Sequence, residues 1–265
     1  MIVDIHTHIF PPRMVRDRAA LLEAEPAFAE LYAAPRATMA TAEDLLASME
    51  RARVDVSVAA GFWWRDPALV EEHARYLVDV AAASGGRIVP FVPGFLDALP
   101  DEVRRGAAGV GEVRIADPAA FAEVGALPLL AHCSEEVGHA YGGKGGGLTP
   151  GALWALLEGR PETRVIAAHW GGGFPFYALM PEVREIVEAG GVVFDSAASS
   201  LLYAPEVFSR VIEVAGLDAV CWGSDFPLRE QAVDRAAVEA ALPDEAARAA
   251  VLGGNAARFL RLEGQ

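Results

Sequence analysis

The stretch that decides the fold is Met1-Ile2-Val3-Asp4-Ile5-His6-Thr7-His8, an apolar run that ends in two histidines separated by one residue. Its β-branched residues are typical of a buried β-strand. Side chains two residues apart on a strand project to the same face, with Cα atoms roughly 6.6–7 Å apart. Neutral imidazole is a common ligand of zinc and other transition metals, so this pair could hold one ion. An isolated pair near a chain end would more often have no such role.

The composition describes a folded protein large enough for one α/β barrel or two small domains. Of the 265 residues, 53% are hydrophobic and 22% are charged. The net charge of −15 argues against a nucleic-acid groove, which needs a basic stripe. No apolar run approaches the roughly 18 residues of a membrane span, and we expect neither a signal peptide nor membrane binding. The two cysteines, Cys133 and Cys221, fit a cytoplasmic protein without disulfides.

Strand-like and helix-like segments alternate eight times along the chain, and most strands are apolar throughout, as in parallel sheets covered by helices. This pattern predicts one α/β domain over residues 1–265, a (β/α)₈ barrel with its active site at the C-terminal strand ends. A doubly wound open sheet is the structural alternative, although no Gly-x-Gly-x-x-Gly follows a predicted strand. The predicted strands are 1–8, 54–60, 87–92, 110–115, 127–132, 164–169, 191–195 and 218–222. The predicted helices include a loose excursion over 13–34 and longer segments over 41–51, 67–84, 97–108, 176–189, 205–215, 228–242, 244–252 and 255–260.

Polar residues with metal-binding side chains gather at the predicted strand ends. Asp225 follows the eighth strand, His139 lies in the loop after the fifth, and His73 falls in a predicted helix, where we interpret it as a surface or packing residue. Imidazoles and a carboxylate that converge on one barrel mouth make a metal site with an open position for water. The histidines at strand ends are His6, His8, His132 and His169.

Five motifs, spread from the first strand to the last helix, resemble those of the amidohydrolase superfamily. The resemblance is closest to the "amidohydrolase 2" branch, which is similar to aminocarboxymuconate-semialdehyde decarboxylase. That branch includes hydrolases, lactonases and non-oxidative decarboxylases, so the resemblance implies a metal-dependent enzyme and leaves the reaction open. The motifs are Asp4-Ile5-His6-Thr7-His8, Leu130-Ala131-His132, Ala167-Ala168-His169-Trp170-Gly171-Gly172, Trp222-Gly223-Ser224-Asp225-Phe226-Pro227 and Gly254-Asn255-Ala256-Ala257-Arg258-Phe259.

The resemblance also implies roles for individual residues. Four positions match the family's metal ligands, and Asp225 among them matches the carboxylate that accepts a proton from metal-bound water. His169 matches a histidine that polarises the substrate or binds a second metal. We expect one or two divalent ions, zinc in the first place and manganese as the alternative. A helix N-cap is the other interpretation of Asp225. The four matching positions are His6, His8, His132 and Asp225.

The fourth predicted strand leaves two interpretations open. Glu112 and Arg114 lie on the same face of this strand. A glutamate here resembles the metal ligand of the bacterial deoxyribonuclease branch, yet Glu112 and Arg114 could instead form a polar pair inside the barrel. A buried carboxylate needs a partner, and either a metal or an arginine would serve.

The loop after the fifth strand, residues 134–147, lies on the predicted active-site face. Five of the six residues after Tyr141 are glycines, and the remaining one is Lys144, the only lysine of the chain. Glycine makes such a loop mobile enough to act as a lid. Lys144 and His139 are candidate substrate-binding residues, as are Arg114 and Trp63. Solvated loop positions and aromatic packing are the simpler alternatives for these residues.

The sequence predicts a metal-dependent hydrolase that uses activated water on a small, polar, carboxylated amide, ester or lactone. Asp225 and His169 are the predicted catalytic residues. Non-oxidative decarboxylation of an aromatic or enoic acid is the alternative reaction, and a barrel that only binds a ligand is the third interpretation. We expect a small-molecule substrate, and the chain could also assemble with copies of itself.

Overall fold

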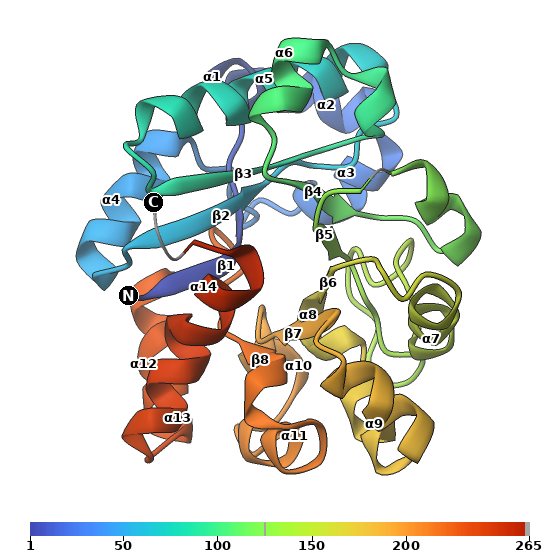
Figure 1. Ribbon diagram of the computed structural model, residues 1–265. Helices are drawn as coiled ribbons and strands as arrows, with labels where there is room; N and C mark the ends of the chain where they lie inside the picture. The colour runs from blue at the N-terminus through green and yellow to red at the C-terminus, as the bar shows by residue number, and fades with distance from the viewer. Residues whose placement is uncertain (125, 263–265) are drawn as a thin grey trace.

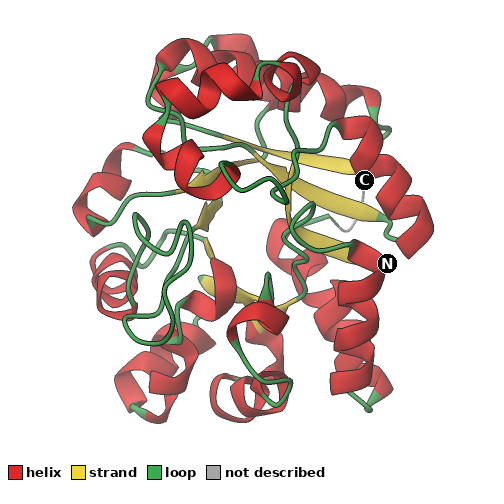
Figure 2. Cartoon of the chain, turned by 180° about the vertical axis from the view of Figure 1, so that it is seen from behind, coloured by secondary structure: helices red, strands yellow, loops and turns green. Residues whose placement is uncertain are grey.

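The computed structural model describes residues 1–124 and 126–262, and its strands form a ring surrounded by helices (Figures 1 and 2). Eight strands pair in parallel, in chain order, within one sheet. This arrangement confirms the predicted (β/α)₈ barrel. The strands are β1 (Val3–His8), β2 (Val56–Ala60), β3 (Ile88–Val92), β4 (Gly109–Val113), β5 (Leu129–Ala131), β6 (Val165–Ala167), β7 (Val192–Asp195) and β8 (Val220–Cys221).

The barrel closes through hydrogen bonds between β1 and the segment that follows β8. The amide of Ile5 donates to the carbonyl of Trp222 (3.0 Å), and the amide of Asp225 donates to the carbonyl of His6 (2.9 Å). Thr7 and Phe226 complete the contact as a parallel bridge. The predicted ligands His6 and Asp225 are therefore held together by the closing seam itself.

The barrel interior is filled by a cluster of apolar side chains taken from alternate strand positions. Leu130, Ile166 and Val193 belong to this cluster. Each is followed within three residues by a polar residue at the C-terminal end of its strand or just beyond it, and these are His132, His169 and Asp195. Helix α14 (Asn255–Leu260) adds Ala256 and Phe259 to the same cluster. An apolar layer thus lies beneath a polar layer at the C-terminal strand ends, as expected for this fold.

A second, larger cluster lies between the strands and the surrounding helices. Cys133 is fully buried in it. The helices are α1 (Pro12–Arg16), α2 (Arg18–Ala24), α3 (Pro26–Tyr32), α4 (Ala42–Ala52), α5 (Pro67–Ala83), α6 (Asp101–Gly106), α7 (Pro150–Gly159), α8 (Ala168–Gly171), α9 (Pro181–Glu188), α10 (Ser199–Leu202), α11 (Val207–Ala215), α12 (Gln231–Ala241), α13 (Glu245–Ala249) and α14 (Asn255–Leu260). Short helical turns are η1 (Leu96–Ala98), η2 (Pro118–Glu123), η3 (Phe174–Leu179), η4 (Leu217–Ala219) and η5 (Ala250–Gly254).

Proline explains two differences from the predicted helices. The helix predicted over 97–108 is divided into η1 and α6, and the helix predicted over 176–189 is divided into η3 and α9. Pro100 and Pro181 stand at the two breaks. Proline lacks an amide hydrogen and disfavours the helical conformation of the residue before it, so a helix begins at such a position more readily than it crosses it.

His73 of α5 is buried, so its interpretation as a packing residue holds and a surface position is wrong. Its Nε2 donates to the carbonyl of Ile9 (2.7 Å), and its Nδ1 accepts from the indole nitrogen of Trp64 (2.9 Å). Burial lowers the pKa of His73 to about 4. The ring is therefore neutral and packs against the rings of Phe10 and Trp64.

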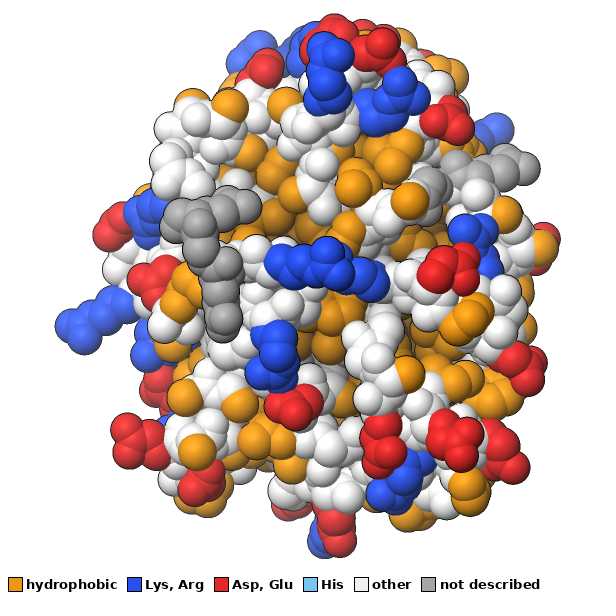
Figure 3. Space-filling model, viewed as in Figure 1, with side chains coloured by type: hydrophobic (Ala, Val, Ile, Leu, Met, Phe, Trp, Pro, Cys, Tyr) orange, Lys and Arg blue, Asp and Glu red, His pale blue; other side chains and the backbone are white. Residues whose placement is uncertain are grey.

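The outer surface carries charges of both signs. On the face seen in Figure 3, arginine and acidic side chains are scattered among hydrophobic ones. None of the helices in residues 1–124 and 126–262 combines the length and the apolar character needed to cross a membrane.

Gly109 provides a test of the interior packing. A Cβ atom at Gly109 would lie 2.4 Å from the ring of Phe91, whereas one at Gly151 of α7 would meet nothing within 4 Å. Gly109→Ala should therefore lower the free energy of unfolding by about 1–3 kcal/mol. Gly151→Ala should leave it unchanged or raise it slightly. Urea unfolding of both variants checks this, and equal stabilities would contradict the packing.

Candidate metal centre and adjoining pocket

The two histidines of β1 turn their rings toward each other at the end of the strand. Their Nε2 atoms are 3.0 Å apart, and His6 is fully buried. The pairing register of β1 shifts between Asp4 and Thr7, so strict alternation does not hold along the strand. Ile5 packs in the barrel interior, while Asp4 bonds Ser224 and Gln231 on another side of the strand.

Two carboxylates approach this pair. Oδ1 of Asp225 is 3.4 Å from Nε2 of His8 and 3.8 Å from Nε2 of His6. The oxygens of Glu112 are 3.7 Å from Nε2 of His8 and 4.0 Å from Nε2 of His6. Two donors that are each about 2.1 Å from one ion lie about 3.0–3.4 Å apart at bond angles of about 90–109°. His6, His8 and Asp225 thus have nearly the spacing of ligands on one ion, with Glu112 slightly farther away.

His132 and His169 meet the same glutamate from other strands. Nδ1 of His132 is 2.7 Å from Oε1 of Glu112, and Nε2 of His169 is 3.5 Å from that oxygen. Glu112 with His132 and His169 forms a second group of potential ligand atoms, which overlaps the first group of His6, His8 and Glu112. The structure therefore brings together the five residues that the sequence singled out as ligands, with His169 beside them.

Asp195 is a member of this cluster that the sequence analysis missed. Its Oδ2 lies 2.9 Å from Nδ1 of His6, and its Oδ1 accepts from the amide of His169 (2.8 Å). The residue is fully buried. A carboxylate that accepts a hydrogen bond from Nδ1–H of a histidine leaves the Nε2 lone pair free for a metal. The sequence feature that could have identified Asp195 is its position as the last residue of the predicted seventh strand.

Arg114 bears on the two interpretations left open for β4. Its Nη1 donates to Oε2 of Glu112 (3.4 Å), so the predicted polar pair exists. The same glutamate also faces the histidines, so pairing does not remove it from the metal centre. The guanidinium further donates to the carbonyl of Gly143 and lies 3.2 Å from Nε2 of His132.

The charges of this cluster shift the pKa values of its members. Burial would lower the pKa of His6, but the neighbouring carboxylates, Asp195 foremost, raise it to about 10. Burial would raise the pKa of Asp225, but a hydrogen bond from His8 and the charge of His6 lower it. Burial and Arg114 lower the pKa of His132 to about 4. Carboxylates that favour a positive charge on a buried imidazole would equally favour a bound cation.

The donor set fits a divalent ion on these grounds. The donors converge from three places in the barrel. They are Nε2 of His6 and of His8 on β1, an oxygen of Glu112 on β4 and an oxygen of Asp225 after β8. His6 is fixed by Asp195 in the tautomer that a metal needs. His132 and His169 share Glu112 and could complete the site or hold a second ion.

Asp225 itself lies in a left-handed backbone conformation with φ 62°. This conformation is uncommon for residues other than glycine, and it costs on the order of 1–3 kcal/mol. The interpretation of Asp225 as a helix cap is wrong, because the next helix, α12, begins at Gln231 with Glu230 as its cap. The bond from the Asp225 amide to the carbonyl of His6 holds the residue at the centre instead.

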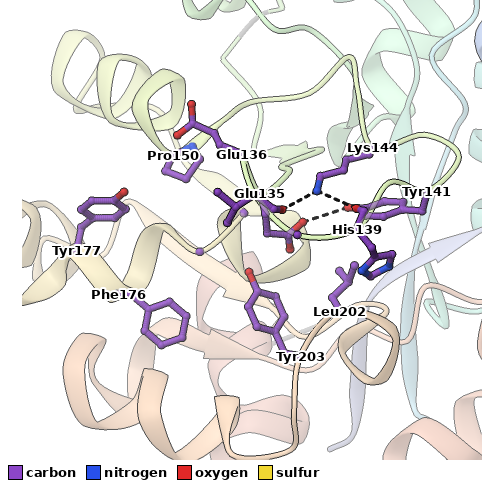
Figure 4. A pocket seen from close by; sticks show the side chains of 14 residues that line it. Glu135, Glu136, His139, Tyr141, Lys144, Pro150, Phe176, Tyr177, Leu202 and Tyr203 are labelled. Carbon is purple, nitrogen blue, oxygen red and sulfur yellow. Dashed lines mark hydrogen bonds between the residues drawn. The ribbon is translucent and has the colours of Figure 1, made fainter.

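A pocket of about 480 Å³ lies beside the loop that follows β5, and none of its lining residues is one of the candidate metal ligands (Figure 4). The loop after β5 forms one wall, and residues that follow His169 and β7 form the other. Both His139 and Lys144 line it, and their contact with a substrate stays a prediction. The ammonium of Lys144, however, donates to the carbonyls of Val137 (2.6 Å) and His139 (3.0 Å) within its own loop.

Trp63 lies elsewhere. It is half-buried and packs edge-to-face against Phe95, with ring centroids 5.7 Å apart, and it does not line this pocket. Contact of Trp63 with a substrate stays a prediction, and the structure shows the aromatic packing that was its alternative.

Comparison with known proteins bears on the family. Residues 144–262 match the model of the amidohydrolase family. The predicted resemblance is confirmed. With it, the prediction of an enzyme is confirmed as well. No curated protein matches the chain at the level of its sequence.

Solved structures match this chain over nearly its whole length. They include 5-carboxyvanillate decarboxylase from Sphingomonas paucimobilis, with a TM-score of 0.71, 18% identity and coverage of 98% of both chains. The 2,6-dihydroxybenzoate decarboxylase from Rhizobium has a TM-score of 0.73, 14% identity and coverage of 99% of both chains. A 5-carboxyvanillate decarboxylase from Novosphingobium aromaticivorans, complexed with manganese and 4-hydroxy-3-methoxy-5-nitrobenzoic acid, has a TM-score of 0.72, 14% identity and coverage of 98% and 96%. At these identities the likeness shows the shared fold.

Removal of the β1 histidines tests the metal centre. His6→Ala and His8→Ala should each lose bound metal, because each removes a nitrogen donor from the closest pair. The fold should persist, since the apolar layer beneath is untouched. Metal analysis with circular dichroism measures both properties, and His139→Ala in the exposed loop is the matched control that should keep its metal. Full metal occupancy in either β1 variant would contradict the assignment.

Asp195→Asn tests the support of His6. The variant keeps the size of the side chain but weakens the acceptor that fixes the His6 tautomer. Metal affinity should fall by about 10–100-fold. Competition with a chelator measures this, and Asp218→Asn, at a side chain that is 85% exposed, should leave affinity unchanged. Unchanged affinity in Asp195→Asn would show that the carboxylate serves packing alone.

Proposed function

We propose that this protein is a metal-dependent, non-oxidative decarboxylase of an aromatic acid. The observation that carries the proposal is a centre of carboxylates and imidazoles whose His132 contacts the carbonyl of Gly143, in the loop that forms one wall of a pocket with aromatic side chains. Tyr141, Phe176 and Tyr203 are among those side chains. The decarboxylases that share this fold along the whole chain support the same reaction. Each of them acts on a ring that carries a carboxylate.

Different residues would bind the carboxylate and the ring of the substrate. A divalent ion held by His6, His8, Asp225 and Glu112 would supply positive charge that stabilises negative charge on the substrate. Arg114 adds a guanidinium at the same centre, and its planar fork suits a carboxylate. The pocket would hold the ring, and the walls would exclude water from it.

The reaction requires one proton. The bond between the ring carbon and the carboxylate breaks, carbon dioxide leaves, and the ring carbon keeps the electron pair. That carbon then takes a proton, which His169 or Asp225 would deliver and recover from solvent. Both residues are held in left-handed backbone conformations by hydrogen bonds of their amides, so their side chains are preorganised.

Hydrolysis, the reaction that the sequence favoured, uses the same residues differently. Asp225 would then accept a proton from the attacking water, and the match to the amidohydrolase model supports this second candidate. A barrel that only binds a ligand is disfavoured, because it would keep a full set of metal donors without using them.

We propose manganese as the ion, ahead of the zinc that the sequence favoured. Two carboxylates in the donor set suit manganese, whereas a set made of imidazole or thiolate alone would suit zinc. Two of the decarboxylases with this fold hold manganese. Metal analysis of protein purified without chelators decides between the two ions.

Release of carbon dioxide tests the reaction. With hydroxybenzoates as candidate substrates, the protein should form the decarboxylated ring and one equivalent of carbon dioxide. Product analysis by chromatography and trapping of labelled carbon dioxide measure both, and His6→Ala is the control without activity. Hydrolysis of esters or lactones without any carbon dioxide would replace this proposal with the hydrolase alternative.

Asp225→Asn tests the proton-transfer role. Asparagine keeps the size and one oxygen donor but cannot carry the proton, so turnover should fall by about 10²–10⁴-fold at confirmed metal occupancy. Asp244→Asn is the matched control, because Asp244 caps helix α13 and asparagine caps about as well. A rate near that of the unmodified protein in metal-loaded Asp225→Asn would exclude Asp225 from proton transfer.

A further inference from the structure

The end of helix α3 lies beside two of the segments that build the metal centre. A Cβ atom at Gly143 would lie 2.3 Å from Cδ2 of Leu31 and 3.1 Å from Nη2 of Arg114, so the loop after β5 approaches both α3 and that arginine. In the segment that follows α3, the hydroxyl of Thr38 donates to the carbonyl of Pro227 (3.4 Å), which lies after β8. Helix α3 therefore ends between the loop after β5 and the segment after β8.

Tyr32 is the last residue of α3, and aromatic contacts fix its ring next to the end of β1. The ring stacks on Phe28, with centroids 4.5 Å apart, and packs edge-to-face against Phe10 at 5.4 Å. Phe10 lies two residues after His8 in the sequence. Aromatic rings held by stacked and edge-to-face neighbours keep a defined orientation. The Tyr32 ring is thus held in place close to the histidines of β1.

The hydroxyl of Tyr32 has no partner among residues 1–124 and 126–262. The side chain is half-buried, and neither a backbone group nor another side chain of this part of the chain forms a hydrogen bond with its hydroxyl. Other tyrosines do form such bonds, since Tyr76 accepts from the amide of Ala42 (2.8 Å) and Tyr141 donates to Glu135 (3.2 Å). A polar group in largely apolar surroundings that lacks a partner is available to a ligand.

The charges of the metal centre act on this hydroxyl. Burial raises the pKa of Tyr32, the charges of Asp225 and Glu112 raise it further, and Arg114 opposes them. Interactions between charges weaken with distance, so the hydroxyl lies near both carboxylates that flank the histidines of β1. The hydroxyl stays protonated and can donate a hydrogen bond. An anionic ligand at the centre would supply the acceptor that this donor lacks.

We propose that Tyr32 is a substrate-binding residue of the metal centre, and that its hydroxyl donates a hydrogen bond to the carboxylate of the bound substrate. Arg114 would supply positive charge to the same carboxylate, and Tyr32 would supply a neutral donor. Because the aromatic cluster already fixes the ring, little conformational entropy is lost when the bond forms. The inference rests on the proposed function only in placing a substrate carboxylate at the metal centre.

Equilibrium binding of benzoate tests the proposal without turnover. In isothermal titration of the manganese-loaded, full-length protein, Tyr32→Phe should bind benzoate about tenfold more weakly than the unmodified protein, because a hydrogen bond to a charged acceptor is lost. The phenylalanine ring keeps the stacking on Phe28, so the urea midpoint should stay the same. Competition with a chelator should show unchanged affinity for manganese.

Tyr76→Phe is the matched control. It also removes one phenol hydroxyl, but that hydroxyl bonds the amide of Ala42 between helices α4 and α5. This variant should unfold at a lower urea concentration and keep the benzoate affinity of the unmodified protein. A role of Tyr32 in packing alone would leave benzoate affinity unchanged in Tyr32→Phe.

Several results would overturn the inference. Undetectable benzoate binding by the unmodified protein would do so, as would equal affinities of the unmodified protein and Tyr32→Phe. An equal loss of benzoate affinity in Tyr76→Phe, or a loss of manganese from Tyr32→Phe, would also contradict it. Failure of decarboxylation is a separate result, because binding is measured without the reaction. A protein that releases carbon dioxide, and whose Tyr32→Phe variant binds benzoate normally, would keep the proposed function and lose this inference.

Discussion

The carboxylate of Glu112 is a buried negative charge that must be compensated, and the arrangement of the barrel mouth follows from that requirement. His132 lies 2.7 Å from it, and His169 and Arg114 lie 3.5 Å and 3.4 Å away. His8 is only slightly farther, at 3.7 Å. The Glu112 side chain of β4 thus lies close to imidazoles from β1, the end of β5 and the segment after β6. Removing it would leave imidazoles that face one another without a common anion.

The closing seam of the barrel places the second carboxylate. Because the amide of Asp225 bonds the carbonyl of His6, the position of Asp225 depends on the last contact that completes the sheet. Asp4 strengthens this seam, since it accepts hydrogen bonds from the hydroxyl and amide of Ser224 at 2.6 Å and 3.0 Å. Burial raises the pKa of Asp4 to about 6. The same hydrogen bonds therefore close the sheet and position Asp225 beside His6.

Sequence periodicity predicted the barrel because each strand is an apolar run that ends at a polar residue. The same logic identified His6, His8, His132, His169 and Asp225, which all follow such runs. It missed Asp195, because a single carboxylate at a strand end has no partner visible in the sequence until His6 is placed opposite it. It could not foresee that Lys144 would bond its own loop, since backbone carbonyls compete for an ammonium as strongly as a ligand does. The aromatic side chains of the pocket, Tyr141, Phe176 and Tyr203, come from three separate segments, so only the three-dimensional structure shows that they lie together.

The loop after β5 connects the pocket to the centre physically. The carbonyl of Gly143 lies 3.0 Å from Nε2 of His132 and also accepts from Arg114. Tyr141 and Lys144, which flank that glycine closely in sequence, line the pocket. A ligand that displaces this loop would therefore alter the partners of both His132 and Arg114. Conversely, a carboxylate bound by Arg114 would compete with the Gly143 carbonyl for the same guanidinium. Occupation of the pocket and the charge balance at Glu112 are coupled through this one peptide group.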